Sequence, residues 1–432
     1  MPVHSSRIIP VMSETIPVKQ ANSQEHDTSL LTVDEALKRI MALATPISET
    51  ETLAIRDALD HILAEPIISP LDVPPHANSA MDGYAVRAGD LPTTGETTLH
   101  VIGTAWAGRP FAGTIKDGQC VRIMTGANIP AGSDTVIMQE QVQRQDDTIT
   151  IGSGHQAGQN VRHAGEDIAE GNAVLAAGQR IGPAELGLLA SLGIAQVKTK
   201  RRLRVAFFST GDELQPVGTK LAEGQIYDSN RYTLHGMLTQ LGVEIIDMGV
   251  IRDDPTAIET AFTQAAQQAD AIITSGGVSV GEADFVKATL DKLGKVDFWR
   301  IAMKPGKPLA IGKINNALFF GLPGNPVSVM ATFYLFATPA LRQMMGQSIS
   351  PPLHVTAISK GKLKKTPGRM DFQRGQLSNE NGRLVVDATG MQASHILSGM
   401  SRANCFIVLP REAGDIEAGS EVDVIPFHGI IN

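Results

Sequence analysis

The chain has 432 residues, a formal net charge of −8 at neutral pH, 42% hydrophobic residues and 19% charged residues. This composition is typical of a soluble globular protein, and the length predicts several domains because one core stops growing at roughly 250–300 residues. Two cysteines exclude a disulfide scaffold and a cysteine-only zinc site. We expect no membrane span, since no apolar run approaches about 18 residues, and no nucleic-acid partner, since the charge is negative.

The first ordered element is predicted to begin after Thr32. Residues 1–28 are polar and are expected to form a disordered tail without a targeting signal, so the expected location is cytoplasmic. Thr32-Val-Asp-Glu35 is a capping box, which predicts a helix that ends before Pro46. A second helix is predicted from Arg56 to Ala64.

A β-rich segment interrupts this helical sequence. Between residues 67 and 163, short β-type runs alternate with Gly, Pro, Asn and Asp, and the expected strands are Thr97–Gly103, Cys120–Met124, Thr135–Gln139 and Thr148–Ile151. Helical sequence returns afterwards, where Pro183 begins a helix and Gly193 ends it. We therefore predict a mixed helical domain built from residues 29–66 and 164–200, with a β-rich domain inserted at 67–163.

Residues 201–349 alternate between strands and helices, which is typical of a parallel sheet covered on both faces. The predicted strands are Val205–Ser209, Val243–Met248, Ala271–Thr274, Val296–Ile301, Leu309–Ile314 and Ala317–Phe320. The predicted helices are Tyr232–Leu241, Thr256–Gln268, Asp284–Leu293 and Val327–Met345. Residues 350–432 are again β-rich, at His354–Ser359, Leu384–Asp387 and Phe406–Leu409, and predict a small C-terminal barrel or sandwich.

Anion-binding features stand at the ends of the predicted α/β strands, where ligands bind in open α/β sheets. The glycine-rich Ser275-Gly-Gly277 can point backbone N–H groups at an anion. Gly324 and Asn325 precede a helix N-terminus, which favours phosphate. Lys304 and Lys307 supply positive charges for oxyanions.

Carboxylates at the same strand ends predict a magnesium site. Glu213, Asp253 and Asp284 offer the oxygen ligands that Mg²⁺ takes beside substrate phosphates. Together with the anion-binding loops and the lysines, they predict phosphoanhydride chemistry. There is no Walker A sequence and no Gly-x-Gly-x-x-Gly after a strand, so neither a P-loop hydrolase nor a Rossmann dehydrogenase is supported.

A serine hydrolase is the competing interpretation. Gly277-Val-Ser-Val-Gly281 fits the nucleophile elbow, with Ser279 as nucleophile and His354, His395 or His428 as base. An elbow serine leads straight into a helix, whereas Glu282-Ala-Asp284 intervenes here, and all three histidines fall in the C-terminal β region. These departures disfavour the hydrolase.

Eight motifs, in this order, resemble the molybdopterin molybdenumtransferase family, which includes MoeA and the E domain of gephyrin. They are Asn78-Ser-Ala-Met-Asp-Gly-Tyr-Ala85, Arg122-Ile-Met-Thr-Gly-Ala127, Gly165-Glu-Asp167, Ser209-Thr-Gly-Asp-Glu-Leu214, Gly224-Gln-Ile-Tyr-Asp-Ser-Asn230, Thr274-Ser-Gly-Gly-Val-Ser-Val-Gly281, Lys304-Pro-Gly-Lys-Pro308 and Gly321-Leu-Pro-Gly-Asn-Pro-Val-Ser328. The resemblance extends from about Thr32 to the C-terminus.

The resemblance implies a multidomain α/β protein with a parallel-sheet, MogA/MoaB-like α/β domain that binds molybdopterin at residues 201–349. It adds a β-rich inserted domain, a mixed helical N-terminal domain and a small C-terminal β-barrel domain at 350–432. It implies Mg²⁺-dependent insertion of molybdate into adenylylated molybdopterin, with cleavage of the phosphoanhydride and release of AMP. It also implies a homodimer with the site between subunits, and transient contact with the upstream molybdopterin adenylyltransferase.

The family's functional residues carry over position by position. The implied catalytic residues are Asp82, Thr125, Asp167, Glu213, Asp253, Asp284 and Lys304, and the implied magnesium ligands are Glu213, Asp253 and Asp284. The implied substrate-binding residues are Ser275, Gly276, Gly277, Ser279, Arg300, Lys307, Pro323, Gly324, Asn325, Arg369, Arg374 and Ser394. Arg300 departs from relatives that have lysine there, but it keeps the positive charge.

Two further interpretations belong to other classes. Gephyrin-like proteins also act as scaffolds, but this chain shows neither a fused adenylyltransferase domain nor a long linker. Tungstate could replace molybdate, since the two oxyanions are similar in size and charge, and no residue distinguishes them.

Overall fold

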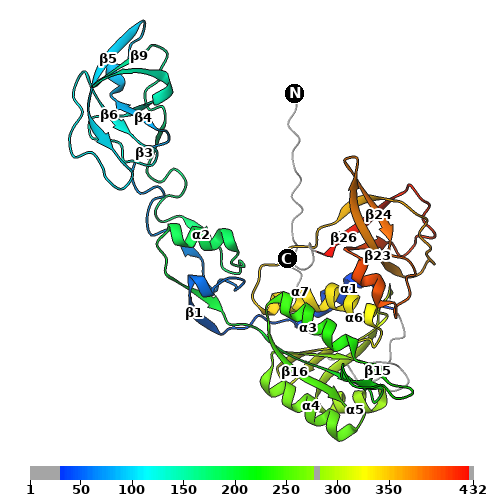
Figure 1. Ribbon diagram of the computed structural model, residues 1–432. Coiled ribbons are helices and arrows are strands. Elements are labelled where there is room, and N and C mark those ends of the chain that lie inside the picture. The colour runs from blue at the N-terminus through cyan, green and yellow to red at the C-terminus, as the bar shows by residue number, and fades with distance from the viewer. Residues whose placement is uncertain (1–29, 277–282, 428–432) are drawn as a thin grey trace, which may run out of the picture.

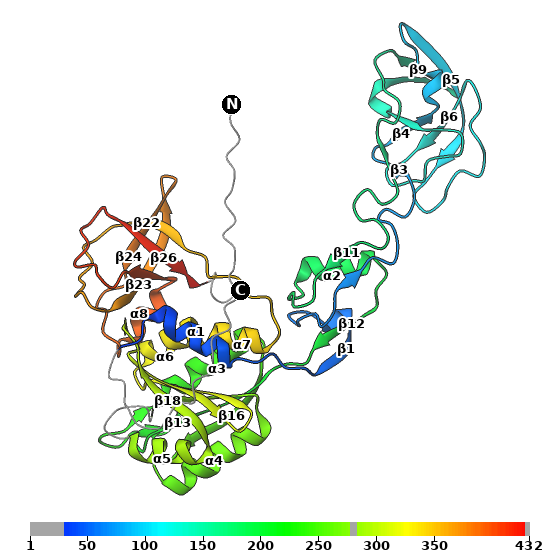
Figure 2. The ribbon, with the colours of Figure 1, turned by 180° about the vertical axis from the view of Figure 1, so that it is seen from behind.

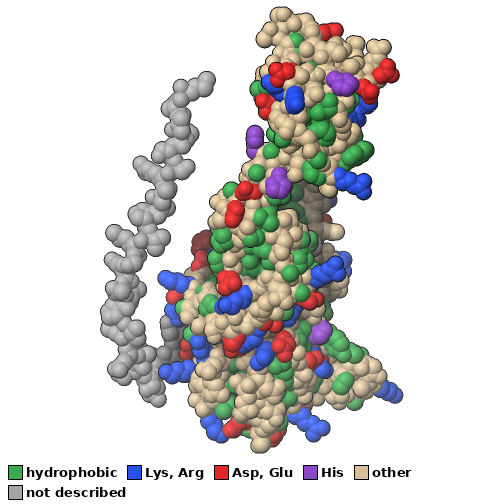
Figure 3. Space-filling model, turned by 90° about the vertical axis from the view of Figure 1, so that its left-hand side faces the viewer, with side chains coloured by type: hydrophobic (Ala, Val, Ile, Leu, Met, Phe, Trp, Pro, Cys, Tyr) green, Lys and Arg blue, Asp and Glu red, His purple; other side chains and the backbone are tan. Residues whose placement is uncertain are grey.

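The computed structural model describes residues 30–276 and 283–427. The α/β domain and the C-terminal barrel lie side by side, and a slender arm carries the inserted β-rich domain far from both of them (Figures 1 and 2). In side view, a narrow neck joins the inserted domain to the rest of the molecule (Figure 3). Within the described ranges, no helix is long and apolar enough to cross a membrane.

The α/β domain is built on a six-stranded sheet of order β16-β13-β17-β21-β20-β18. The first four strands are parallel: β16 (Glu244–Ile251), β13 (Arg204–Thr210), β17 (Ala271–Ser275) and β21 (Ala317–Leu322). β20 (Pro308–Ile314) is antiparallel to both β21 and β18 (Gly294–Arg300), which corrects the expectation of an all-parallel sheet. Asn315 and Asn316 alone link β20 to β21, and so short a link allows only an antiparallel hairpin.

Helices cover both faces of this sheet, as the sequence predicts. α3 (Ser229–Leu241), α4 (Pro255–Gln268) and α5 (Ala283–Leu293) are confirmed. On one face, Phe262 of α4 stacks edge to face with Phe208 and Phe319 of the sheet, with ring centroids 5.1 and 5.4 Å apart. On the other face, Val205 and Phe207 join the main core. Successive residues of β13 therefore pack against opposite layers, which explains the continuous apolar run.

The long helix predicted after Asn325 has a break in its middle. α6 (Pro326–Thr332) and α7 (Thr338–Met344) are separated by a π-helical turn at Phe333–Ala337. Pro339 has no N–H to donate to the preceding turn, which favours this local rearrangement.

Helix α1 (Val33–Leu43) packs on the α/β domain. Its predicted cap is present, because the Thr32 hydroxyl accepts a hydrogen bond from the Glu35 N–H. Ala36 and Ile40 are buried in the same core as α6 and α7. The helix is thus near the arm in sequence but belongs to the α/β core.

The arm contains two small antiparallel sheets and one helix. The pairs are β1 (Thr50–Ala54) with β12 (Gln196–Lys200) and β2 (Ile67–Ile68) with β11 (Ala173–Leu175), beside α2 (Pro183–Ser191). The predicted helix Arg56–Ala64 is wrong, since only a 3-10 turn forms at Ile55–Asp57. Asp60 has a left-handed φ of 65°, and Leu63 bridges to Thr199 of β12, so β pairing takes the place of the helix.

The inserted domain is a six-stranded sheet with a short ribbon at its base. The order is β7 (Thr135–Met138), β4 (Gly83–Val86), β6 (Gln119–Ile123), β5 (Glu96–Ala105), β9 (Thr148–Gly152) and β8 (Val142–Gln145). The ribbon pairs β3 (Asn78–Ser79) with β10 (Val161–Arg162). The sequence missed β4, whose four residues are all buried between β6 and β7.

The C-terminal domain is a closed β-barrel rather than a sandwich. Five strands form a ring because β23 pairs with both β24 and β25: β22 (Val355–Ser359), β23 (Met370–Glu380), β24 (Arg383–Ala388), β25 (Cys405–Leu409) and β26 (Glu421–Pro426). Strand β23 was not predicted from the sequence, because its buried residues Asp371, Gln373 and Arg374 are polar and interrupt the alternation of apolar and polar residues. A sixth strand, β19 (Met303–Lys304), runs parallel to β23 and joins the barrel to the α/β domain.

The close packing of β4 makes Gly83 a sensitive position. A Cβ atom at Gly83 would lie 2.0 Å from the Ile137 carbonyl oxygen. We therefore expect Gly83→Ala to destabilise the inserted domain by about 2–4 kcal/mol, measured by denaturant unfolding of the full chain. Gly152→Ala is the matched control, because open space surrounds that strand position. Equal stability of the two variants would contradict this packing argument.

Candidate active site

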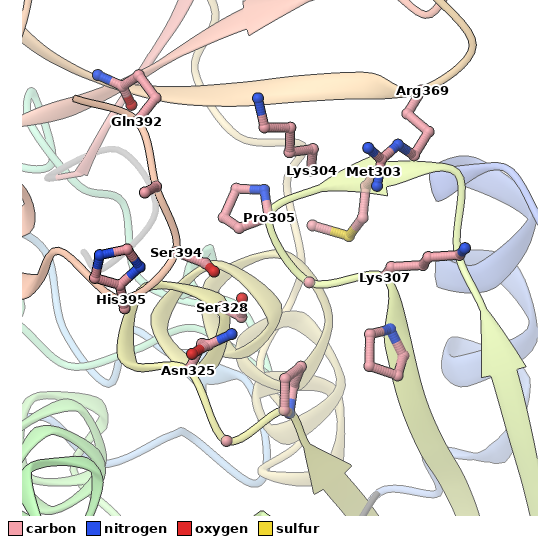
Figure 4. A pocket seen from close by; sticks show the side chains of 15 residues that line it. Met303, Lys304, Pro305, Lys307, Asn325, Ser328, Arg369, Gln392, Ser394 and His395 are labelled. Carbon is pink, nitrogen blue, oxygen red and sulfur yellow. The ribbon is translucent and has the colours of Figure 1, made fainter. Parts of the chain in front are cut away.

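A cavity of about 500 Å³ lies where the α/β domain meets the barrel. Three segments line it: residues 303–308 before β20, residues 323–328 at the start of α6, and residues 392–395 between β24 and α8 (Leu397–Arg402). Arg369 closes the edge from the barrel (Figure 4). Of the sequence-predicted residues, the structure brings together here Lys304, Lys307, Pro323, Gly324, Asn325, Arg369 and Ser394.

Strand polarity explains why these segments meet. β21 ends and β20 begins at the same edge of the sheet, because the two strands are antiparallel. Arg300, the last residue of β18, pairs with Pro308 at this edge and is exposed. Gly306 has a φ of +96°, and a Cβ there would lie 2.6 Å from the Thr332 methyl group, so the turn beside α6 requires glycine.

Lys304 is held by a buried carboxylate of the barrel. Its Nζ lies 3.6 Å from Oδ2 of Asp371, whose side chain is only 5% exposed. The same oxygen accepts a hydrogen bond from the Gln373 amide at 3.1 Å, and Gln373 also donates to the Lys364 carbonyl. The ammonium group of Lys304 is therefore fixed near the cavity by residues of another domain.

Arg374 lies behind the cavity wall instead of lining it. This side chain is 1% exposed, and its guanidinium donates to the carbonyl oxygens of Met391 and Ala393 at 2.7 and 2.9 Å. Its Nε donates to the side-chain oxygen of Gln392. Desolvation by burial lowers the pKa of Arg374. In the structure this residue holds the 389–395 loop, so the expectation that it contacts substrate directly does not match its position.

Two of the predicted carboxylates stand on the loops that follow two neighbouring strands. Glu213 follows β13 and Asp253 follows β16, both are exposed, and the two loops touch where Asp212 accepts a 3.3 Å hydrogen bond from the Asp253 N–H. Asp212 was missed, although it stands beside Glu213 in the same motif. These oxygen donors are of the kind that magnesium takes.

The third predicted ligand is described only in its backbone. Asp284 is the second residue of α5, and its side chain lies outside the described part of the structure, as do Gly277 and Ser279. Among the residues that are described, no three His, Cys, Asp or Glu side chains form a metal-binding group. The complete magnesium site therefore stays a prediction.

Ser275 and Gly276 stand at the end of β17. The Ser275 hydroxyl lies 3.1 Å from the Ser209 hydroxyl, and both side chains are buried. Gly276 has a φ of +90° and donates its N–H to the Leu322 carbonyl at 3.2 Å. Through these contacts, Ser275 and Gly276 link the end of β17 to the ends of β13 and β21.

Asp82 and Thr125 meet at the surface of the inserted domain. Oδ1 of Asp82 accepts hydrogen bonds from the N–H of Thr125 at 2.7 Å and from its hydroxyl at 2.8 Å. These two bonds, the backbone bond first, lower the pKa of Asp82. Asp167 is exposed on the loop before β11. Within one chain, the inserted domain lies far from the cavity (Figure 1), so the two groups of residues do not come together.

Sequence reasoning missed three polar residues of the cavity wall: Ser328, Gln392 and His395. His395 was considered only as a hydrolase base, although it directly follows Ser394, which the resemblance implied to bind substrate. Of the other candidate bases, His354 is on the barrel, where its Nδ1 lies 2.6 Å from Oδ2 of Asp423. His428 lies outside the described residues.

Comparisons with known proteins agree with this architecture. Residues 31–193 match the family description "MoeA N-terminal region (domain I and II)", residues 206–343 match "Probable molybdopterin binding domain", and residues 356–427 match "MoeA C-terminal region (domain IV)". The chain belongs to the MoeA family of molybdopterin molybdenumtransferases, enzymes of molybdenum cofactor biosynthesis. The family and the fold class predicted from the sequence are thereby confirmed.

Individual relatives cover nearly the whole chain. A molybdopterin molybdenumtransferase from Haemophilus influenzae is 49% identical over 93% of this chain and all of its own length. One from a Nostoc species is 37% identical over 87% of this chain and 88% of its own. The crystal structure of a molybdopterin biosynthesis MoeA protein from Pyrococcus horikoshii is 30% identical, with a TM-score of 0.81 over 92% of this chain and all of that one.

The buried guanidinium of Arg374 predicts a specific structural effect. Arg374→Lys removes the paired donors that reach Met391 and Ala393, so we expect a loss of about 2–4 kcal/mol in stability. Amide hydrogen exchange in the 389–395 loop should become faster, because the loop loses its anchor. Arg369→Lys is the control, since Arg369 is exposed and should change stability by less than about 0.5 kcal/mol. Unchanged exchange in the loop would contradict the anchoring role.

Proposed function

We propose that this chain inserts molybdate into adenylylated molybdopterin, cleaves the phosphoanhydride and releases AMP. The observation that carries the proposal is the cavity, whose charged lining residues are Lys304, Lys307 and Arg369, with no Asp or Glu among the described residues that line it. Such a cavity suits a ligand that carries several negative charges. Both adenylylated molybdopterin and molybdate are ligands of this kind. The identity of the substrates is inferred from the family, and the positive charge of the cavity is complementary to their negative charge.

In this proposal, the chain's own residues act by position and charge. Lys304, fixed by Asp371, and Lys307 hold the phosphates and the oxyanion in place. The loop at Pro323-Gly-Asn325 and the side chains of Arg369 and Ser394 contact the substrate from the two other walls. Charges that are already in place stabilise the negative charge of the transition state without reorganisation.

We propose that magnesium takes part and is held by Glu213, Asp253 and Asp284. The exposed carboxylates on the touching loops after β13 and β16 fit this ion in their chemistry. When bound, it would neutralise charge on the phosphate oxygens. Ser275, Gly276 and Arg300 stand at the same edge of the sheet and are proposed to contact the substrate there, with Gly277 and Ser279 continuing the same loop.

We further propose that the working site is shared between two copies of this chain. Asp82, Thr125 and Asp167 would come from the partner subunit, because the arm keeps them far from the cavity of their own chain (Figure 1). We also propose domain limits at 29–66 with 164–200, 67–163, 201–349 and 350–432, except that helix α1 packs in the core of the α/β domain. The substrate would arrive by transient contact with the upstream adenylyltransferase.

The first test is AMP release from adenylylated molybdopterin by the purified full-length protein with magnesium. We expect AMP to appear only when molybdate is also present, together with active cofactor. Removal of magnesium with a chelator should stop the release, and adding magnesium back should restore it. A folded protein that releases no AMP in the presence of molybdate would overturn the proposal.

The second test uses two inactive variants in one dimer. Lys307→Ala damages the cavity and Asp82→Ala damages the inserted domain, so each variant alone should lose about a hundredfold or more in kcat/KM. Mixed after unfolding and refolding together, they should recover about a quarter of wild-type activity, because each mixed dimer then contains one intact shared site. A site confined to one chain would give no recovery.

A further inference from the structure

His395 is a titratable residue of the cavity wall to which no role has been assigned so far. Its side chain is exposed to the cavity, beside Asn325, Ser328 and Ser394, while Lys307 and Arg369 lie across the opening (Figure 4). Among the described residues, its imidazole has no side-chain hydrogen-bond partner. An imidazole left without a partner in a cation-lined cavity is available to a ligand.

The backbone that carries His395 is fixed on two sides. On the barrel side, the guanidinium of Arg374 binds the carbonyl oxygens of Met391 and Ala393. On the α/β side, the carbonyl oxygen of Ser394 accepts a 3.1 Å hydrogen bond from the N–H of Val327 in α6. The loop therefore spans the junction between the domains, and its position at the cavity does not depend on the His395 side chain.

We propose that His395 is a further substrate-binding residue that donates a hydrogen bond to a tetrahedral oxyanion in the cavity. The oxyanion is either the phosphate of the nucleotide or the molybdate, because both present negatively charged oxygens to the same wall. The inference deepens the proposed function and rests on it. A structural role for this side chain has no support within the described ranges, where it contacts no other side chain through a hydrogen bond.

The charges around His395 determine the expected pH dependence. The charged side chains that face it are those of Lys304 and Lys307 from the loop before β20 and Arg369 from the barrel; the 392–395 segment and the start of α6 add none. Asp371 lies behind Lys304 and is buried. A protonated imidazole adds positive charge, so the oxyanion should bind more tightly at lower pH.

The experiment measures binding of two probes, AMP and molybdate, by calorimetry. Full-length wild type, His395→Gln and the control His235→Gln are compared at about pH 6 and about pH 8, on either side of the usual imidazole titration. His235 is an exposed residue of α3 that does not line the cavity. Comparison at one pH cancels the titration of the probe itself, and circular dichroism verifies that each variant is folded.

We expect His395→Gln to weaken binding about fivefold at the lower pH and less than about twofold at the higher pH. A loss for AMP alone identifies the nucleotide phosphate as the partner, and a loss for molybdate alone identifies molybdate. His235→Gln should match wild type in every measurement. Wild-type affinity in His395→Gln, or an equal loss at both pH values, would overturn the inference.

Failure of this inference can be told apart from failure of the proposed function. Wild-type protein that releases AMP in the presence of molybdate, with binding unchanged in His395→Gln, overturns the role of His395 alone. Wild-type protein that releases no AMP but shows the pH-dependent binding difference overturns the proposed function and supports an oxyanion site at His395. Absence of binding of both probes to wild type overturns the inference.

Discussion

A two-residue parallel pairing between β19 and β23, together with a hydrophobic core that the two domains share, joins the barrel to the α/β domain beside the cavity. Met303 pairs with Met370 and Lys304 pairs with Asp371, while the N–H of Met370 donates to the Ala302 carbonyl at 2.8 Å. This junction brings the turn before β20, the start of α6 and the 389–395 loop around one space. Two lysines, a histidine and an arginine from two domains thus line one cavity, where we propose that they bind one ligand.

Buried charge supports the same junction. Arg374 is satisfied by carbonyl and amide oxygens, and Lys365 donates its ammonium to the carbonyl oxygens of Thr366, Arg411 and Ala413. Desolvation lowers the pKa of both side chains, while Asp371 opposes the effect. Burying such groups is costly unless they are hydrogen-bonded. The bonds of Arg374 fix the 389–395 loop that borders the cavity, and those of Lys365 tie together loops of the barrel.

The arm places the second group of proposed site residues at a distance from the cavity. Asp82 and Thr125 are bonded to each other within the inserted domain, so their arrangement does not depend on the rest of the chain. Their separation from the cavity is what a shared site between two copies would require. The mixed-dimer experiment therefore tests the contribution of the inserted domain to the proposed site, and the His395 measurements test the cavity wall.

The amino-acid sequence by itself determined the elements with strong local signals and the motifs at their ends. The capping box at Thr32, helices α3 and α4, and the residues after β13 and β21 were predicted because periodicity, caps and turn residues act within a few positions. The two-residue link between β20 and β21 already implies an antiparallel pair, although the strand pattern alone favoured a parallel sheet. The tertiary structure alone decided that Arg374 faces the protein interior and that His395 faces the cavity. Such outcomes depend on which residues meet across the chain, and a local pattern does not record contacts between segments that are distant in sequence.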